Sequence, residues 1–127
     1  MRAFDHIGIV TDQPQDGESW VPASQVWVTN PRTHPQRIEY VRFKEPPQTD
    51  PGDVGQWKLA HLPHVAYRVD DLEAAIEDEE VVYGPFEPGD FARAVFVHKD
   101  GAIVEYIEYR RLDTWFGQAT PWCPAGP

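Results

Sequence analysis

Two stretches of the chain repeat one arrangement, in which a predicted strand with an early histidine is followed by a later strand with a glutamate. His6 stands in FDHIGIVTD and is followed by Glu39 in RIEYVRF. His64 stands in LPHVAYRVDD and is followed by Glu105 in GAIVEYIEY. An internal repeat of this kind constrains the fold more than any single motif does. We therefore expect two versions of one structural unit, with their four side chains forming one site.

The spacing within the two units differs by the length of a short helix. The interval from histidine to glutamate is 33 positions in the first unit and 41 in the second. The eight additional positions match a predicted helix over Asp70–Asp78, which Asp70 would cap with Glu73 three positions later. The predicted buried stripe of this helix consists of Leu72, Ala75 and Ile76.

The rest of the chain favours short strands. Thirteen prolines and nine glycines in 127 residues leave little room for helix. Pro14, Gly17 and Pro22 predict a loop with at most a short turn between Thr11 and Ala23. Strands are expected at Phe4–Val10, Ser24–Thr29, Arg37–Phe43, His64–Val69, Glu79–Phe86, Arg93–His98 and Ile103–Tyr109.

Strand alternation also assigns the residues of the first strand to two faces. Phe4, His6, Gly8 and Val10 are expected on one face, and Asp5 with the two isoleucines on the other. The fold class is thus α+β in one domain over 1–127. We expect a first module at about 4–43, a linker at 44–60 that is mobile or lies over the surface, a second module at about 62–110, and a tail at 111–127.

Composition excludes several classes of partner. The formal net charge of −10, from 21 acidic and 11 basic residues, argues against nucleic acid and anionic membranes. No apolar run approaches the ~20 residues of a membrane span, and the N-terminus lacks a signal-peptide pattern. The single cysteine, Cys123, offers no disulfide within the chain. A cytoplasmic protein is the expectation.

Three segments together resemble the vicinal oxygen chelate superfamily, which includes glyoxalase I and methylmalonyl-CoA epimerase. They are DHIGIV at the start, PHVAYRVDDLEAAI at the centre and DGAIVEYIEY near the end. The resemblance covers nearly the whole chain from Phe4 to Arg110. It implies two paired βαβββ modules that form a U-shaped mixed sheet around a divalent metal, here with the helix of the first module reduced or absent. The implied ligands are His6, Glu39, His64 and Glu105.

The residue types are consistent with that chemistry. Two imidazoles and two carboxylates suit one Zn²⁺, Ni²⁺, Co²⁺, Mn²⁺ or Fe²⁺ ion. Such an ion acts as a Lewis acid on a carbonyl, and Glu39 or Glu105 would remove the proton from the neighbouring carbon. We expect a metal-dependent isomerase, epimerase or lyase that acts on a small oxygenated metabolite. Arg68, two residues after His64 on the same predicted face, would bind a substrate anion or else pair with one of the glutamates.

Other interpretations remain open at this level. A single histidine on a strand is more often a packed core residue than a ligand, and it is the repeated pairing with glutamate that favours a metal site. One enzymatic alternative is a ring-cleaving Fe²⁺ dioxygenase that uses His6, His64 and Glu105, with Glu39 outside the triad. A metal-free small-molecule (drug) binding protein is another. Three further histidines, His34, His61 and His98, are expected at the surface, and the last two could also line the mouth of a pocket.

The tail suggests an oligomer. Trp115, Phe116 and Trp122 lie in it, and a small domain is not expected to cover all three rings alone. We therefore expect a homodimer, with the metal site either within one chain or shared between two.

Overall fold

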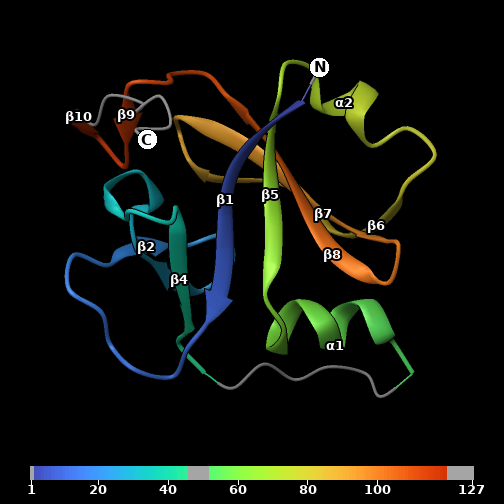
Figure 1. Cartoon of the computed structure of the whole chain (residues 1–127), viewed down its shortest axis with the longest axis horizontal. Coiled ribbons are helices and arrows are strands. Elements are labelled where there is room, and N and C mark those ends of the chain that lie inside the picture. Colours follow the sequence, from blue (N-terminus) through green and yellow to red (C-terminus); the bar gives the residue numbers. More distant parts are fainter. Residues whose placement is uncertain (1, 46–51, 120–127) are drawn as a thin grey trace.

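The computed structural model describes residues 2–45 and 52–119, which form one curled main sheet, a separate two-stranded sheet and short helices (Figure 1). The strands are β1 (Arg2–Val10), β2 (Ser19–Val21), β3 (Val26–Val28), β4 (Ile38–Phe43), β5 (His64–Val69), β6 (Glu80–Gly89), β7 (Ala92–Lys99), β8 (Ala102–Tyr109), β9 (Thr114–Trp115) and β10 (Gln118–Ala119). The helices are a 3-10 turn at Pro31–Thr33, α1 (Val54–His61) and α2 (Leu72–Ala75).

The main sheet confirms the predicted repeat. Its strand order is β2-β3-β4-β1-β5-β8-β7-β6, so each half of the chain supplies four adjacent strands. The first and last strands of each half run parallel, β1 beside β4 and β5 beside β8. The two halves join through the antiparallel pair β1 and β5 at the centre. The four strands predicted to carry the site are therefore the four neighbours at the middle of the sheet.

The sheet curls into the expected U shape, and side chains and a turn near its two edges make contact, so that the U is nearly closed. Val21, Val26 and Val28 from β2 and β3 share one hydrophobic cluster with Phe91 and with residues of β7 and β8. The Tyr83 hydroxyl of β6 donates a hydrogen bond to the Ala23 carbonyl, at 2.9 Å. The concave face is consequently enclosed by strands of one chain.

A β-bulge changes the predicted faces of β1. Phe4 pairs with Tyr67 and His6 with Ala66, so that Asp5 is the additional residue in the ladder. Asp5 and His6 are both buried as a result, whereas the Phe4 side chain is 45% exposed. The prediction that Phe4 shares the His6 face was wrong, because strict alternation does not hold across a bulge.

Helix α1 lies inside the segment for which the composition predicts a linker. Its N-cap is Asp53, whose side chain accepts a hydrogen bond from the Gln56 backbone N–H at 3.0 Å. The three prolines of the 44–60 segment all precede residue 52, and no proline interrupts the helix itself. The high proline content of the 44–60 segment as a whole therefore hides the fact that residues 52–60 contain no proline. The helix packs against β6, β7 and β8; residues 46–51 lie outside the described part of the chain.

The predicted helix over Asp70–Asp78 is shorter than expected. Helix α2 covers Leu72–Ala75 only, and its N-cap is Asp71 rather than Asp70. The chain then turns, and Asp78 adopts a positive φ of 65°. Leu72 is fully buried and packs with Ala75 and Ile76 against β7 and β8, as the predicted stripe requires.

The first unit contains no helix between Thr11 and Ser24, as expected, but it does contain an additional strand that the sequence pattern does not predict. β2 is only three residues long, too short for alternation to indicate it, and it pairs with β3 at the edge of the sheet. No helix among the described residues is long and apolar enough to cross a membrane.

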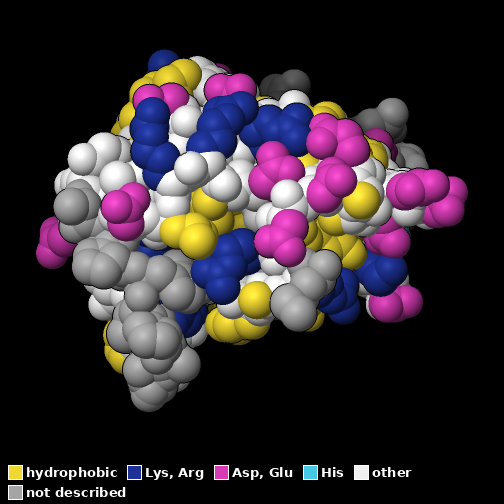
Figure 2. Space-filling model, turned by 90° about the horizontal axis from the view of Figure 1, so that it is seen from above, with side chains coloured by type: hydrophobic (Ala, Val, Ile, Leu, Met, Phe, Trp, Pro, Cys, Tyr) yellow, Lys and Arg dark blue, Asp and Glu magenta, His cyan; other side chains and the backbone are white. Residues whose placement is uncertain are grey.

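The surface mixes charges of both signs. On the face seen in Figure 2, several lysine and arginine side chains lie next to one another, with aspartates and glutamates around them. The exclusion of nucleic acid as a partner stays a prediction. Of the tail aromatics, Trp115 is 3% exposed and packs with Phe116 against Phe91. Trp115 is therefore covered within the chain and Phe116 only in part; Trp122 and Cys123 lie outside the described residues.

Candidate metal centre

The four predicted ligands come together at the centre of the sheet. His6 stands on β1, Glu39 on β4, His64 on β5 and Glu105 on β8, and one ligand atom of each lies within 4.8 Å of those of all the others. All four residues are buried. The complete group of four side chains is thus assembled within one chain.

The strand register explains why the two modules deliver their side chains to one place. Glu39 lies opposite Gly8, two residues after His6, and Glu105 lies opposite Ala66, two residues after His64. Across the central pair, His6 faces Ala66 and Gly8 faces His64. The two halves are therefore related by an approximate two-fold axis between β1 and β5.

Each of the two histidine rings lies opposite a small residue on the neighbouring strand. A Cβ built on Gly8 would overlap the His64 ring. At the symmetric position Ala66 is fully buried opposite His6. The repeat thus includes a histidine and, two residues later, a residue small enough to accept the partner histidine.

The spacing of the ligand atoms suits a small divalent ion. His64 Nε2 lies 3.1 Å from Glu105 Oε1, and His6 Nε2 lies 3.2 Å from the same oxygen and 3.4 Å from Glu39 Oε1. Ligands at ~2.0–2.2 Å from a metal are about 3.0 Å apart at right angles and about 3.4 Å apart at tetrahedral angles. His6 Nε2 is moreover buried without a hydrogen-bond partner among the described residues, so the donor set fits a metal.

The charges within the group of four side chains also favour a cation at this place. Burial alone would lower the pKa of His6, but Glu39, Asp5 and Glu105 raise it well above 6.5. Burial would raise the pKa of Glu105, yet its contacts with His6 and His64 lower it to about 2. Two buried carboxylates need a positive charge beside them. A proton on His6 can provide it, and a divalent cation provides more.

A further buried carboxylate orients His6. Asp5 Oδ2 lies 2.7 Å from His6 Nδ1, and it also accepts a hydrogen bond from the Tyr109 hydroxyl at 2.9 Å. Burial and the Asp5 charge raise the pKa of Tyr109 well above 10, which keeps it a hydrogen-bond donor. With Nδ1–H bonded to Asp5, the free Nε2 points to the other ligands, an arrangement typical of metal-binding histidines. One signal in the sequence could have identified Asp5, a charged residue in an otherwise apolar strand, but strand alternation assigns it to the opposite face.

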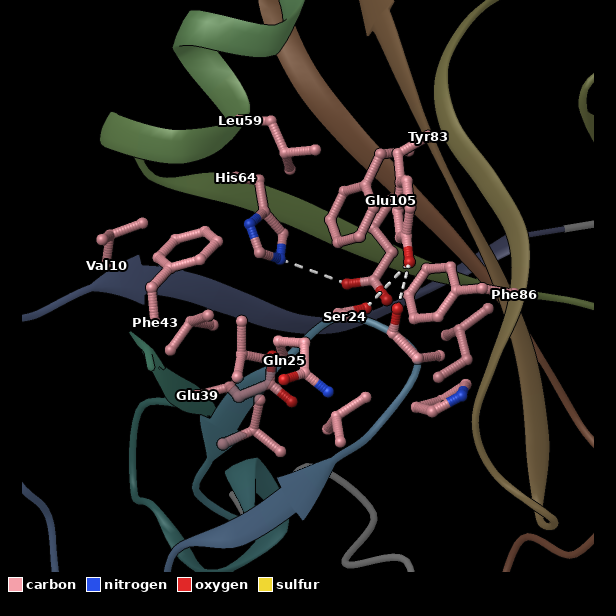
Figure 3. Close-up of a pocket in the computed structure, with 18 of the residues that line it drawn as sticks. Val10, Ser24, Gln25, Glu39, Phe43, Leu59, His64, Tyr83, Phe86 and Glu105 are labelled. Atoms are coloured by element: carbon pink, nitrogen blue, oxygen red, sulfur yellow. Dashed lines mark hydrogen bonds and ion pairs between the residues drawn. The ribbon is translucent and has the colours of Figure 1, made fainter. Parts of the chain in front are cut away.

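The group of four side chains opens into a cavity of about 310 Å³. Figure 3 shows His64, Glu105 and Glu39 around it, together with Tyr83 and Phe86 from β6 and Ser24 from the turn after β2. Other apolar walls are provided by Val10, Val21, Val26, Val28, Val41, Phe43, Leu59, Phe96, Ile107, Trp115 and Phe116. The sequence pattern does not identify this lining, because it comes from seven different strands, a helix and the tail.

The remaining candidates lie elsewhere. Arg68 is partly buried on β5 but is not among the residues that line the cavity. None of His34, His61 and His98 lines it either; His61 is exposed and stacks on Trp57, and His98 contacts Lys58. The structure therefore brings together the four predicted ligands and leaves the predicted anion-binding arginine outside.

Comparison with known proteins supports the fold. No family model and no curated protein matches the sequence. A hypothetical protein from Bacillus halodurans has a similar structure over 87% of this chain and 96% of its own, with a TM-score of 0.56 and 16% identity. Methylmalonyl-CoA epimerase from Mycobacterium tuberculosis is similar over 85% of this chain and 88% of its own, with a TM-score of 0.55 and 17% identity. The chain has the fold of the vicinal oxygen chelate superfamily.

Proposed function

We propose that this protein is a metal-dependent isomerase, epimerase or lyase that moves a proton on the carbon next to a carbonyl group. The observation that carries the proposal is the convergence of two histidines and two glutamates, all buried, beside an apolar cavity. A fold shared with an epimerase is consistent with it. His6, Glu39, His64 and Glu105 would hold one divalent ion, which supplies Lewis-acid stabilisation of charge on a substrate oxygen.

The two glutamates have different surroundings, which separates their roles. Glu105 lies within 3.2 Å of both histidines and is fixed between them. Both glutamates line the cavity, but Glu39 has only one such contact, at 3.4 Å. Glu39 is therefore the better general base, because it can turn toward a substrate with less loss of contact. It would take a proton from carbon and return it to a neighbouring atom on the same face; inversion at the carbon would require a second acid on the opposite face.

Deuterium exchange tests this role, because it follows the transferred proton itself and does not require the final product to be identified. Hydroxy ketones incubated in D₂O with metal-loaded protein should lose the NMR signal of the proton next to the carbonyl. Glu39→Gln should bind the ion with reduced affinity and exchange at least 100-fold more slowly, since loss of a general base typically costs ~10²–10⁴ in rate. Glu87→Gln, at an exposed glutamate paired with Arg110, is the matched control and should exchange at the normal rate.

Two results would redirect the proposal. Full exchange by Glu39→Gln would remove this residue from catalysis. Oxygen consumption with a catechol by the Fe²⁺-loaded protein, without any exchange, would favour the ring-cleaving dioxygenase.

A further inference from the structure

The cavity beside the metal centre contains no cationic side chain. All eleven lysines and arginines of the sequence lie in the part of the chain that the structure describes, and none of them lines the cavity. The ionisable groups that do line it are the four metal ligands and Tyr83. A phosphate or carboxylate placed among these walls would have no basic partner, and a buried unpaired charge is strongly disfavoured.

The metal centre does not supply the missing charge. A divalent ion with Glu39, Glu105 and two neutral imidazoles has a formal charge of zero, since the two carboxylates balance the ion. An anionic substrate would make the buried site net negative. An uncharged substrate with two neighbouring oxygen atoms leaves the balance unchanged.

The apolar walls indicate what the rest of the substrate is. The Phe86 ring is nearly parallel to Phe96, with centroids 5.9 Å apart, and lies 4.8 Å from the Tyr83 ring. Phe96 in turn meets His64 edge-on, at 4.9 Å. A row of aromatic rings thus leads from the cavity wall to a metal ligand (Figure 3). Such a surface favours a flat apolar or aromatic group, through burial and ring contacts.

The size of the cavity agrees with a compact ligand. Its volume of about 310 Å³ is at the lower end of the ~300–1,000 Å³ typical of ligand pockets. The phosphates of a coenzyme A ester would have to remain outside. The other polar side chains of the lining are all of uncharged types: Ser24, Gln25, Gln56 and Tyr83.

We propose that the site takes a compact, uncharged substrate with an aromatic or similarly flat apolar body and two neighbouring oxygens, a hydroxy ketone rather than a coenzyme A ester or a phosphorylated metabolite. This inference rests on the proposed metal-dependent function and specifies its substrate class. It differs from the sequence-based expectation that Arg68 would receive a substrate anion.

Three small probes separate charge from apolar contact. Calorimetry with the zinc-loaded wild-type protein, which keeps both carboxylates and therefore the formal charge of zero, would compare 2-hydroxyacetophenone, mandelate and hydroxyacetone. 2-Hydroxyacetophenone and mandelate share a phenyl group and differ in charge. 2-Hydroxyacetophenone and hydroxyacetone are both hydroxy ketones, and only the former has a phenyl group. In water mandelate chelates divalent ions better, because its charge adds to the attraction, so the reverse order can only come from the pocket. We expect 2-hydroxyacetophenone to bind at least tenfold more tightly than either of the others.

Two variants test the causes. Phe86→Ala should bring the affinity for 2-hydroxyacetophenone to within threefold of that for hydroxyacetone. Gln25→Lys introduces a cation at an exposed position of the cavity lining, so little disturbance of the fold is expected. In this variant the affinity for mandelate, divided by the affinity for 2-hydroxyacetophenone, should rise at least fivefold.

The outcomes distinguish this inference from the proposed function. Mandelate or hydroxyacetone binding as tightly as 2-hydroxyacetophenone would overturn the substrate class, even if deuterium exchange occurs. The expected order of binding, with no exchange by the wild-type protein, would uphold the class and overturn the catalytic proposal. Faster exchange on a coenzyme A ester than on the ketone would uphold catalysis and overturn the class.

Discussion

Among single residues, Gly8 determines whether His64 can reach the metal centre, because the imidazole occupies the space where a side chain would begin. We expect Gly8→Ala to push the ring away and to lower zinc affinity at least tenfold, as judged by competition with a chelating dye. Ile7→Ala, whose side chain is 37% exposed on the neighbouring position, should retain wild-type affinity. Equal affinity of both variants would mean that the imidazole and the new methyl group do not compete for this space.

Asp5 provides a second test with a single substitution. Its carboxylate holds His6 through Nδ1, and loss of such an outer partner typically lowers metal affinity ~10–100-fold. Asp5→Asn keeps an acceptor but removes the charge, so we expect a smaller loss than for Asp5→Ala. The visible spectrum of the Co²⁺-loaded protein should change in both variants and not in Asp12→Asn, at an exposed position. An unchanged spectrum in Asp5→Ala would exclude the orienting role.

The sequence was sufficient to predict that these four side chains come together, but not which residues support them. The ligands could be found because each histidine and glutamate recurs in the same order on equivalent strands. Alternation assigned Asp5 to the wrong face, since a bulge is a property of the pairing between β1 and β5 and not of either strand alone. The role proposed for Arg68 relied on alternation as well, and the curl of the sheet decides which residues of β5 reach the cavity.

Among the helices and strands, α1 forms one wall of the cavity through Gln56 and Leu59. The hydrogen bond that the Gln56 backbone N–H donates to Asp53 at the start of this helix can be removed without changing any of the four candidate metal ligands. Asp53→Ala should lower the free energy of unfolding by about 1 kcal/mol in urea titrations and leave zinc affinity unchanged. Asp16→Ala, at an exposed position in a turn, should change neither quantity. A stability of Asp53→Ala equal to that of Asp16→Ala would show that the cap contributes nothing.

Most strands were predictable from alternating apolar residues, and the exceptions have physical reasons. β2 has three residues and depends on β3 for its pairing. α1 follows a proline-rich stretch, and the average proline content of the two together does not indicate a helix. α2 ends at Ala75, four residues after its cap, because the chain must turn back to reach β6.

In the molecule as a whole, the approximate two-fold relation between the modules completes the site without a partner. β1 and β5 meet at the axis, and each half contributes one histidine and one glutamate. Light scattering tests the predicted homodimer. All four candidate ligands come from one chain. We expect one divalent ion per chain at every protein concentration; half an ion per chain would point to a site shared between subunits.

Every functional conclusion depends on one metal ion bound among His6, Glu39, His64 and Glu105. Crystals soaked in zinc and measured at the zinc absorption edge would locate such an ion, because anomalous scattering comes from the ion itself. We expect one strong peak in each chain at ~2.0–2.2 Å from all four side chains. The exposed acidic group of Asp71, Glu73 and Glu108 serves as an internal comparison, since it is the other described cluster with suitable spacing. No peak at the buried centre, or a peak only at the exposed group, would contradict the proposed metal centre.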